Sequence, residues 1–261
     1  MKKKIKVAII GGTGFERLFK NTKQLRLGTQ YGIPAPLYVG KVNRRDVVFL
    51  PRHSLTHSIP PHRINYKANI YALYEMGVER ILATNAVGAI NLNFKPGDIV
   101  VPHDFVDFTR LRSTTFFDEA PVTHIDVSQP YCPEIRKLLV KAAKKLGFSV
   151  WDRSVFVCTE GPRYETPAEI EVFRHLGCDV VGMTGIPEAV LARELEMCYA
   201  SICYVSNMAA GVHDRLRALE ISKVSRDAVP KIEQVLIETI KALPHERNCS
   251  CVNALKDARF G

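Results

Sequence analysis

Four short segments, each directly after an apolar run, carry the small and polar residues that bind anions. They are GGTGF (11–15), PRHS (51–54), TNAVGA (84–89) and GMTG (182–185). Glycine-rich turns present backbone N–H groups, and small side chains let a ligand approach the backbone. Arg52 offers a planar fork of donors suited to phosphate, and His53 offers a further donor. The hydroxyls of Thr13 and Thr184 add two more donors.

Two common nucleotide motifs do not fit the first of these segments. The G-x-G-x-x-G spacing fails because Arg17 stands where the third glycine belongs, and no G-K-[ST] follows for a P-loop. Each segment alone is also compatible with a solvated loop. Because ligands of open α/β sheets bind beyond the carboxyl ends of strands, the four segments together predict a phosphate site without a metal, beside a second substrate.

The segment TEGPRYETPAE (159–169) supplies groups suited to a planar organic ligand. Tyr164 offers a flat face for stacking, and Glu165 offers a hydrogen-bond acceptor. An alternative for Glu165 is a first-turn acid of the helix that starts near Pro167, where the helix dipole favours negative charge.

Alternating apolar runs and amphipathic segments must position these residues. Strands are expected at 6–10, 47–50, 81–84, 98–102, 155–158, 179–183 and 201–206, and helices at 133–146, 167–177, 187–197 and 230–243. Residues 103–130 are irregular and polar, which indicates a long functional loop. Without a linker or repeat, the pattern predicts one α/β domain over residues 1–261.

The composition narrows the class of protein. The formal net charge is +9, but the lysines are scattered over predicted helix faces, as at Lys137 and Lys141, so we expect a solvated basic surface and no nucleic-acid partner. No run of 18 apolar residues exists, and the apolar stretch 7–10 is too short for a signal peptide. We therefore expect a cytoplasmic protein without a membrane partner.

The seven cysteines show no C-x-x-C pair and no zinc-ligand spacing, so no metal site is expected. Most lie in apolar surroundings, where cysteine behaves as a small hydrophobe. The segment NCSC (248–251) is unusual, and a stabilising disulfide involving Cys249 or Cys251 is one interpretation.

The complete set of motifs resembles the purine nucleoside phosphorylase and methylthioadenosine phosphorylase family from about residue 5 to about residue 240. The motifs are GGTGF, PRHS, NYKANIYAL, TNAVGAI followed by PGDIV, TEGPRYET, GMTGIPEAVLARE and YASICYVSNMA. The resemblance implies a twisted mixed central β-sheet flanked by helices, and a homotrimer or dimer of trimers with sites between subunits. It also implies that phosphate attacks a purine nucleoside without a metal or organic cofactor. The PRH and GPRY stretches are closest to the methylthioadenosine phosphorylase branch.

The resemblance also assigns roles to single residues. Phosphate contacts are implied for Thr13, Arg52, His53, the Asn85–Ala86 backbone and Thr184. Met183 is implied to pack on the ribose, Tyr164 to lie beside the base, and His124 to reach into the neighbouring subunit's site. Asn207 corresponds to the group at N7 and the six-position of the purine. The implied catalytic residues are therefore Asn207, at the base, and His53, at the phosphate.

The segment VSNMAAG (205–211) bears on the choice of base. The adenine-specific branch carries two aspartates here, at the positions of Asn207 and Ala209. An amide can accept N7–H and donate to O6 of an oxopurine, and Glu165 can accept the N1–H that oxopurines carry. We therefore expect nucleosides of hypoxanthine or guanine as substrates. In the alternative, a water molecule bridges Asn207 to the amino group of adenine, and the enzyme cleaves methylthioadenosine.

The resemblance places Leu219, Ile221 and Val224 beside the 5′ end of the sugar. These apolar residues suit a methylthio group, although helical periodicity also allows them to be core positions. Substrates expected from the whole pattern are 5′-methylthioinosine, inosine and guanosine. Competing classes are a nucleotide-binding oxidoreductase, a nucleic-acid-binding protein and a nucleoside hydrolase that uses water in place of phosphate.

Overall fold

The computed structural model describes residues 5–12, 15, 22–212 and 218–259. Thr13 and Arg17 lie outside the described residues.

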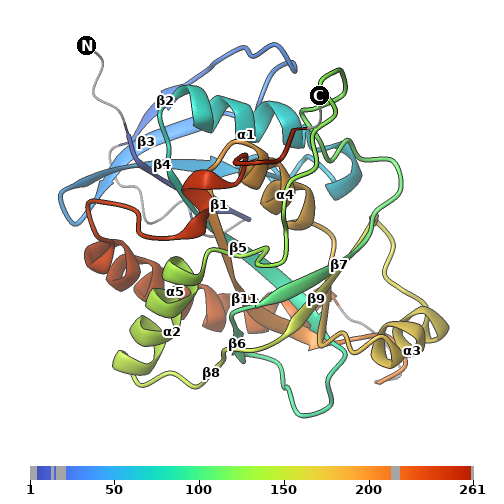
Figure 1. The fold of residues 1–261 in the computed structure, drawn as a ribbon. Coiled ribbons are helices and arrows are strands. Elements are labelled where there is room, and N and C mark those ends of the chain that lie inside the picture. The colour runs from blue at the N-terminus through green and yellow to red at the C-terminus, as the bar shows by residue number, and fades with distance from the viewer. Residues whose placement is uncertain (1–4, 13–14, 16–21, 213–217, 260–261) are drawn as a thin grey trace.

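One mixed sheet of eleven strands forms the centre of the molecule (Figure 1). Its main path runs in the order β2-β3-β4-β1-β5-β10-β9-β7, while β11 pairs with β5 and β6, and β6 pairs with β8. The strands are β1 (Val7–Gly11), β2 (Lys23–Leu25), β3 (Leu37–Val42), β4 (Arg45–Pro51), β5 (Arg80–Ala89), β6 (Ile99–Val100), β7 (Asp104–Phe108), β8 (Val150–Trp151), β9 (Val155–Thr159), β10 (Val180–Gly182) and β11 (Cys198–Met208).

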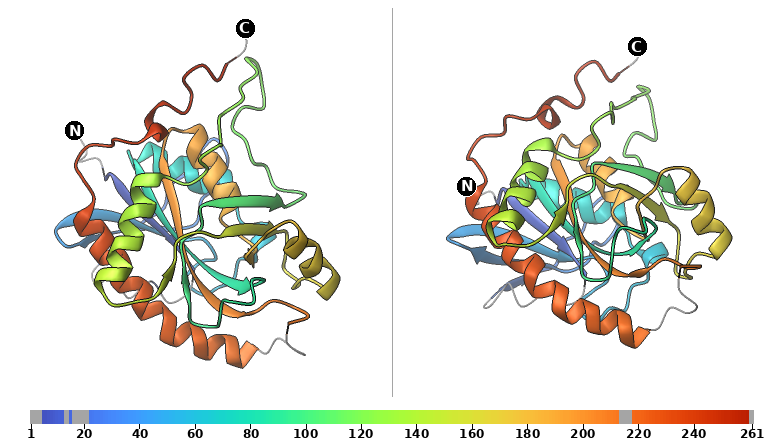
Figure 2. Two further views of the ribbon diagram at one scale, coloured as in Figure 1. Left: turned by 60° about the horizontal axis from the view of Figure 1, so that its bottom comes forward. Right: turned by 90° about the horizontal axis from the view of Figure 1, so that it is seen from below.

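Side-chain alternation along the strands creates two apolar faces. In β1, Val7 and Ile9 join one core cluster, and Ala8 and Ile10 join another. The helices that cover the sheet are α1 (Tyr66–Glu75) and α4 (Ile186–Glu194) on one face, and α2 (Pro133–Lys145) and α5 (Ala218–Ala242) on the other (Figure 2). Burial on both faces explains why these strands are apolar throughout. The predicted α/β fold with a mixed sheet is confirmed.

Strand β5 lies at the centre of the sheet, and one of its two edges is paired only in part. One edge pairs with β11 along the whole strand. On the other edge, β1 pairs with residues 80–83 and β10 with residues 88 and 89. Among the described strands, none pairs with residues 84–87 on that edge. This interval, which we call the β5 gap, leaves backbone groups of the central strand open to a ligand.

The prediction that TNAVGA follows the end of a strand is wrong. Asn85 and Ala86 lie in the middle of β5, because β11 and β10 continue the sheet past the end of β1. The last helix also begins at Ala218, twelve residues before the predicted start, and Pro230 lies inside it. The remaining helical elements are α3 (Pro167–His175) and the short 3-10 helices η2 (Pro61–Arg63) and η3 (Ser250–Asn253).

Residues 104–108, predicted to be irregular, form strand β7 parallel to β9. The rest of that segment, residues 109–130, has no helix or named strand, as expected for a loop. No helix among the described residues is long and apolar enough to cross a membrane.

Candidate active site

A cavity of about 1170 Å³ opens beside the β5 gap. The predicted site residues that line it are Arg52, His53, Asn85, Ala86, Tyr164, Glu165, Met183, Thr184, Asn207, Ala209 and Ile221. They come from the ends of β4, β10 and β11, from the middle of β5, from the segment before α3, and from α5. Leu219, Val224 and His124 are not among the lining residues.

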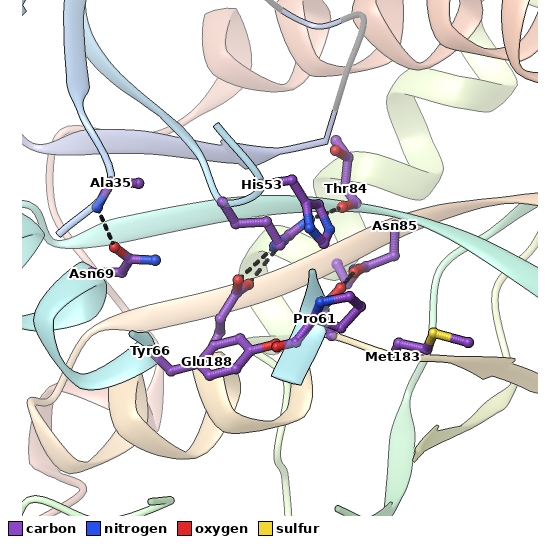
Figure 3. A network of polar contacts seen from close by, with 12 residues as sticks. Ala35, His53, Pro61, Tyr66, Asn69, Thr84, Asn85, Met183 and Glu188 are labelled. Carbon is purple, nitrogen blue, oxygen red and sulfur yellow. Dashed lines mark hydrogen bonds and ion pairs between the residues drawn. The ribbon is translucent and has the colours of Figure 1, made fainter. Parts of the chain in front are cut away.

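Arg52 lies at the end of β4 and forms a buried ion pair. Its Nε and Nη2 atoms donate to the two carboxylate oxygens of Glu188 at 2.6 and 2.9 Å, and Nη1 donates to the carbonyl of Thr84 at 2.7 Å (Figure 3). Burial lowers the pKa of Arg52, but the carboxylate of Glu188 outweighs burial and holds the pKa above its usual value. Glu188 thus occupies the fork that the sequence assigned to phosphate, and two N–H groups of Arg52 remain for another acceptor. The predicted phosphate contact of Arg52 stays a prediction.

His53 is held as a neutral imidazole. Its Nδ1 atom lies 2.8 Å from the carbonyl of Ile59, which can only accept, so Nδ1 carries the proton. Burial, helped by the charge of Arg52, lowers the pKa of His53 from 6.5 to about 4. The remaining Nε2 atom is therefore an acceptor near neutral pH, where the sequence predicted a donor.

A chain of buried polar side chains runs across β5, from Thr184 after β10 to Ser201 on β11. The hydroxyl of Thr184 donates to Asn85 Oδ1 at 2.8 Å, and Asn85 Nδ2 donates to Ser201 Oγ at 2.7 Å. Ala86 is the exposed residue in the buried central stretch of β5. Helix α4 begins two residues after Thr184, so its positive end is directed at the same region. The single hydroxyl hydrogen of Thr184 is thus taken by Asn85, where the sequence predicted a donor to the ligand. Backbone groups at the open strand edge and the start of α4 remain to bind an anion of phosphate size.

A β-bulge in β11 sets the position of Asn207. Val205 pairs with Val87 and Asn207 pairs with Gly88, so Ser206 is the extra residue. Bulges redirect side chains and are common next to active sites. Ser206 Oγ donates to Asn207 Oδ1 at 2.6 Å, and Asn207 Nδ2 donates to the carbonyl of Met208 at 2.8 Å. These contacts orient the amide and leave it one N–H donor and one acceptor position.

Glu165 and Tyr164 enter the cavity from the segment before α3. The hydroxyl of Thr159 donates to Glu165 Oε1 at 2.6 Å, which leaves Oε2 for a ligand. The alternative of a first-turn helix acid does not describe Glu165, since Thr166 is the N-cap of α3 and Glu169 completes its capping box. Tyr164 is 52% exposed, as expected for a ring at the mouth of a cavity.

Met183 is seated against a glycine and held by an arginine that the sequence did not single out. A Cβ atom on Gly161 would lie 2.6 Å from Met183 Sδ, and Gly161 has a φ of +65°. Arg112, from the loop after β7, donates to the carbonyls of Met183 at 2.7 Å and Glu160 at 2.6 Å. Arg112 thereby joins the ends of β9 and β10 behind the cavity.

Comparison with known proteins identifies the family. The model of the phosphorylase superfamily matches residues 6–241. The chain belongs to the phosphorylase superfamily. A probable S-methyl-5′-thioinosine phosphorylase of Methanopyrus kandleri is 50% identical over 97% of this chain and 98% of its own. The 6-oxopurine nucleoside phosphorylase of Pyrococcus furiosus is 48% identical over the same shares.

Solved structures of the phosphorylase superfamily share the fold. A methylthioadenosine phosphorylase from an antarctic soil metagenomic library matches with a TM-score of 0.93 and 31% identity over 99% of this chain and 93% of its own. A mutant adenosine/methylthioadenosine phosphorylase from Schistosoma mansoni, in complex with methylthioadenosine, matches with a TM-score of 0.91 and 33% identity over 98% and 99%. The resemblance drawn from the sequence motifs is confirmed.

Within this phosphorylase fold, the register of α5 corrects part of the predicted 5′ pocket. Ile221 lines the cavity, but Leu219 is 86% exposed, and neither Leu219 nor Val224 is among the lining residues. The cavity face of α5 runs instead through residues 221, 225 and 229, one turn apart, with Ser222 and Arg226 beside them. The placement of Leu219 and Val224 in the pocket is therefore wrong, and this part of the lining is of mixed polarity.

His124 does not reach the cavity of its own chain. Its backbone N–H donates to the carbonyl of Ala258 at 2.8 Å, next to a β-bridge between Thr123 and Arg259. The loop that carries His124 is thus attached to the C-terminal segment. The position is compatible with the expected role in a neighbouring subunit's site, which stays a prediction.

Proposed function

We propose that this chain catalyses the phosphorolysis of 6-oxopurine nucleosides, with 5′-methylthioinosine, inosine and guanosine as substrates. The products are the free purine and the ribose 1-phosphate or its 5-methylthio analogue. The observation that carries the proposal is the amide of Asn207, which keeps one donor and one acceptor position in the same cavity as Arg52, Asn85 and Thr184.

The reaction exchanges one bond at the anomeric carbon for another. A phosphate oxygen forms a bond to C1′ while the bond from C1′ to N9 of the purine breaks, and the bonding electron pair leaves with the base. The sugar gains positive character, which the adjacent phosphate dianion stabilises. The base gains negative charge and takes one proton from solvent at N7, where Asn207 stabilises it. Hydrogen phosphate gives up one proton to solvent as the sugar phosphate dianion forms, so the reaction is balanced.

The phosphate is placed at the β5 gap. The two remaining N–H groups of Arg52, the backbone at Asn85 and Ala86, and the start of α4 supply positive potential. Hydrogen phosphate carries one O–H, and neutral His53 offers Nε2 as its acceptor. This arrangement favours the dianion over a fully deprotonated anion or a neutral ligand.

The base is read by Asn207 and Glu165. The free N–H of Asn207 donates to O6, its carbonyl accepts N7–H, and Glu165 Oε2 accepts N1–H. Adenine lacks N1–H and carries a donor at the six-position, so two of these contacts are lost. The names of the relatives from M. kandleri and P. furiosus support this choice of base.

The ribose and its 5′ end lie against Met183, Tyr164 and the cavity face of α5. Ile221 and Val229 offer apolar contact to a methylthio group, while Ser222 and Ser225 offer hydroxyls to a 5′-hydroxyl. The mixed lining supports acceptance of both kinds of nucleoside. Inorganic phosphate is the co-substrate, and we assign no organic cofactor to the reaction. We also assign the active form to a homotrimer or dimer of trimers in the cytoplasm, with His124 completing a neighbouring site.

Base release from a substrate panel tests the proposal. Methylthioinosine, inosine, guanosine, methylthioadenosine and adenosine are compared with and without phosphate. We expect phosphate-dependent release that favours the oxopurines at least tenfold in kcat/KM, by about 1.4 kcal/mol or more. Preference for methylthioadenosine, the activity named for the similar solved structures, would overturn the base assignment. Equal turnover without phosphate would identify a hydrolase.

A further inference from the structure

Four cysteines that are distant in the sequence converge at one point away from the cavity. Cys132, Cys198, Cys249 and Cys251 are all buried, and their four sulfur atoms lie within 4.8 Å of one another. The sulfurs of Cys198 and Cys249 are 3.3 Å apart. All seven cysteines of the chain are free, and none of these four lines the active-site cavity. The two expectations from the sequence, no metal ligand set and a disulfide at NCSC, both differ from this arrangement.

Three separate elements hold the four sulfurs in place. Cys132 is the N-cap of α2, and its N–H donates to the carbonyl of Tyr199 at 2.8 Å. Cys198 begins β11, and Cys249 and Cys251 come from the N-cap and second position of η3. The cluster is therefore built on a helix start, a central strand and a tight turn.

The geometry is that of a four-coordinate metal site. A tetrahedral ion with metal–sulfur bonds of about 2.3 Å places its four sulfurs about 3.8 Å from each other. Two disulfides would require two pairs of sulfur atoms bonded at about 2.05 Å, and the two pairs would not need to lie close to each other. Here every sulfur is close to each of the other three. Four buried thiols and no carboxylate or imidazole in the set select a soft or borderline cation.

We propose that these four cysteines bind a structural zinc ion. Zn²⁺ replaces the four thiol protons, which are released to solvent, so the bound unit carries a charge of −2. The start of α2 next to Cys132 offsets part of that charge. Because four protein sulfurs complete the coordination shell, the ion has no open position for a substrate, as in structural sites generally.

The zinc ion ties the C-terminal segment, residues 244–259, to the body of the enzyme. That segment is otherwise attached by single contacts, such as Arg247 Nη1 to the carbonyl of Glu196 at 2.6 Å and the N–H of Leu255 to the carboxylate of Glu196 at 3.2 Å. At its far end the carbonyl of Ala258 accepts from the N–H of His124. Metal binding thus orders the tail and, through it, the loop that carries His124.

Metal content and cobalt substitution test the site. The full-length protein is produced in zinc-supplemented medium, purified with a reductant and measured for metals by mass spectrometry. We expect one zinc per chain in the wild type, less than a tenth of that in Cys251→Ser, and one zinc in Cys178→Ser, a buried cysteine outside the cluster. Replacement by Co²⁺ should produce the absorption spectrum of a tetrahedral tetrathiolate in the wild type.

The outcomes distinguish zinc from the alternatives. If Cys251→Ser does not fold, the stoichiometry and cobalt spectrum of the wild type still decide the question. A folded wild type without bound metal would overturn the proposal. So would an intact mass, taken without reductant, that is lower by four hydrogen atoms, because that loss identifies two disulfides. One iron per chain in place of zinc would overturn the choice of ion. Because the readout is metal content, none of these results depends on which nucleoside the enzyme cleaves.

Discussion

At the level of single residues, Asn207 is the position where we expect the exchange of one heavy atom to change the preferred base. Asn207→Asp replaces the free N–H donor with a second acceptor, which suits a 6-amino group and repels O6. We expect the ratio of kcat/KM for methylthioinosine over methylthioadenosine to fall by about tenfold to a hundredfold, the effect of a mismatched buried polar group. Steady-state assays with both substrates measure the ratio. Asn93→Asp, at an exposed position, is the matched control, and an unchanged ratio in Asn207→Asp would reject the assignment.

His53 should make stability depend on pH. Its pKa is about 4 in the folded protein against 6.5 as the ordinary value, so between these limits the unfolded state binds more protons. The contribution of neutral His53 to the free energy of unfolding is fully present above pH 6.5 and is lost as the pH falls towards 4. At pH 5 the loss amounts to about 2 kcal/mol, from 1.36 kcal/mol per pKa unit.

Thermal or urea unfolding at pH 8 and pH 5 checks this. His53→Gln removes the titrating group, so its stability should fall less than that of the wild type over the same interval. His245→Gln, at an exposed position, should behave like the wild type. Equal pH dependence in wild type and His53→Gln would contradict the buried, neutral state of His53.

Glu188 should be essential for stability as well as for the phosphate site. Glu188→Gln leaves the guanidinium of Arg52 buried without a charged partner, and removing one member of a buried ion pair costs about 3–5 kcal/mol. Chemical denaturation should show this loss of stability. In the folded fraction, the KM for phosphate should rise. Glu171→Gln breaks an exposed pair with Arg174 and should change stability by less than about 0.5 kcal/mol. A small effect at Glu188 would mean that the pair is not maintained in solution.

At the level of elements, the face of α5 should select the 5′ substituent. Ile221→His places a polar ring on the cavity face and should lower the kcat/KM ratio of methylthioinosine over inosine by about tenfold, the scale of a lost apolar contact. Leu219→His makes the same change two residues away at a position that is 86% exposed, and should leave the ratio unchanged. Equal effects of the two variants would show that α5 does not contact the sugar.

The elements themselves were predictable where their own residues determined them. Apolar runs located β1, β4 and β11, and Pro133 with Gly147 bounded α2. The errors arose from tertiary pairing. Strand β5 continues through TNAVGA because β10 and β11 pair with it, and α5 continues through Pro230 because its buried face packs on β11 and α2. Local sequence carries neither signal.

At the level of the whole molecule, the sequence predicted the site residues that lie in local motifs, but not those that depend on contacts between distant segments. Short motifs predicted Arg52, Asn85 and Thr184 at the cavity, since each motif combines a strand with small residues. Glu188 and Arg112 were missed because their partners lie 136 and 71 residues away, at Arg52 and Met183. An acid inside the apolar stretch IPEAVL was the available signal for Glu188. The four clustered cysteines come from three distant segments, so no spacing rule could join them.

The β5 gap has a consequence for how enzymes with this sheet can diverge. In the proposed site the anion meets main-chain groups and an ion pair whose removal endangers folding, so we expect most substitutions there to be lost before they alter affinity for phosphate. In the same proposal the base meets Asn207 and Glu165 at the ends of segments, where a side chain can be exchanged at a small cost in stability. Directed evolution from this chain should therefore yield variants with new base preferences far more often than variants that accept a nucleophile other than phosphate.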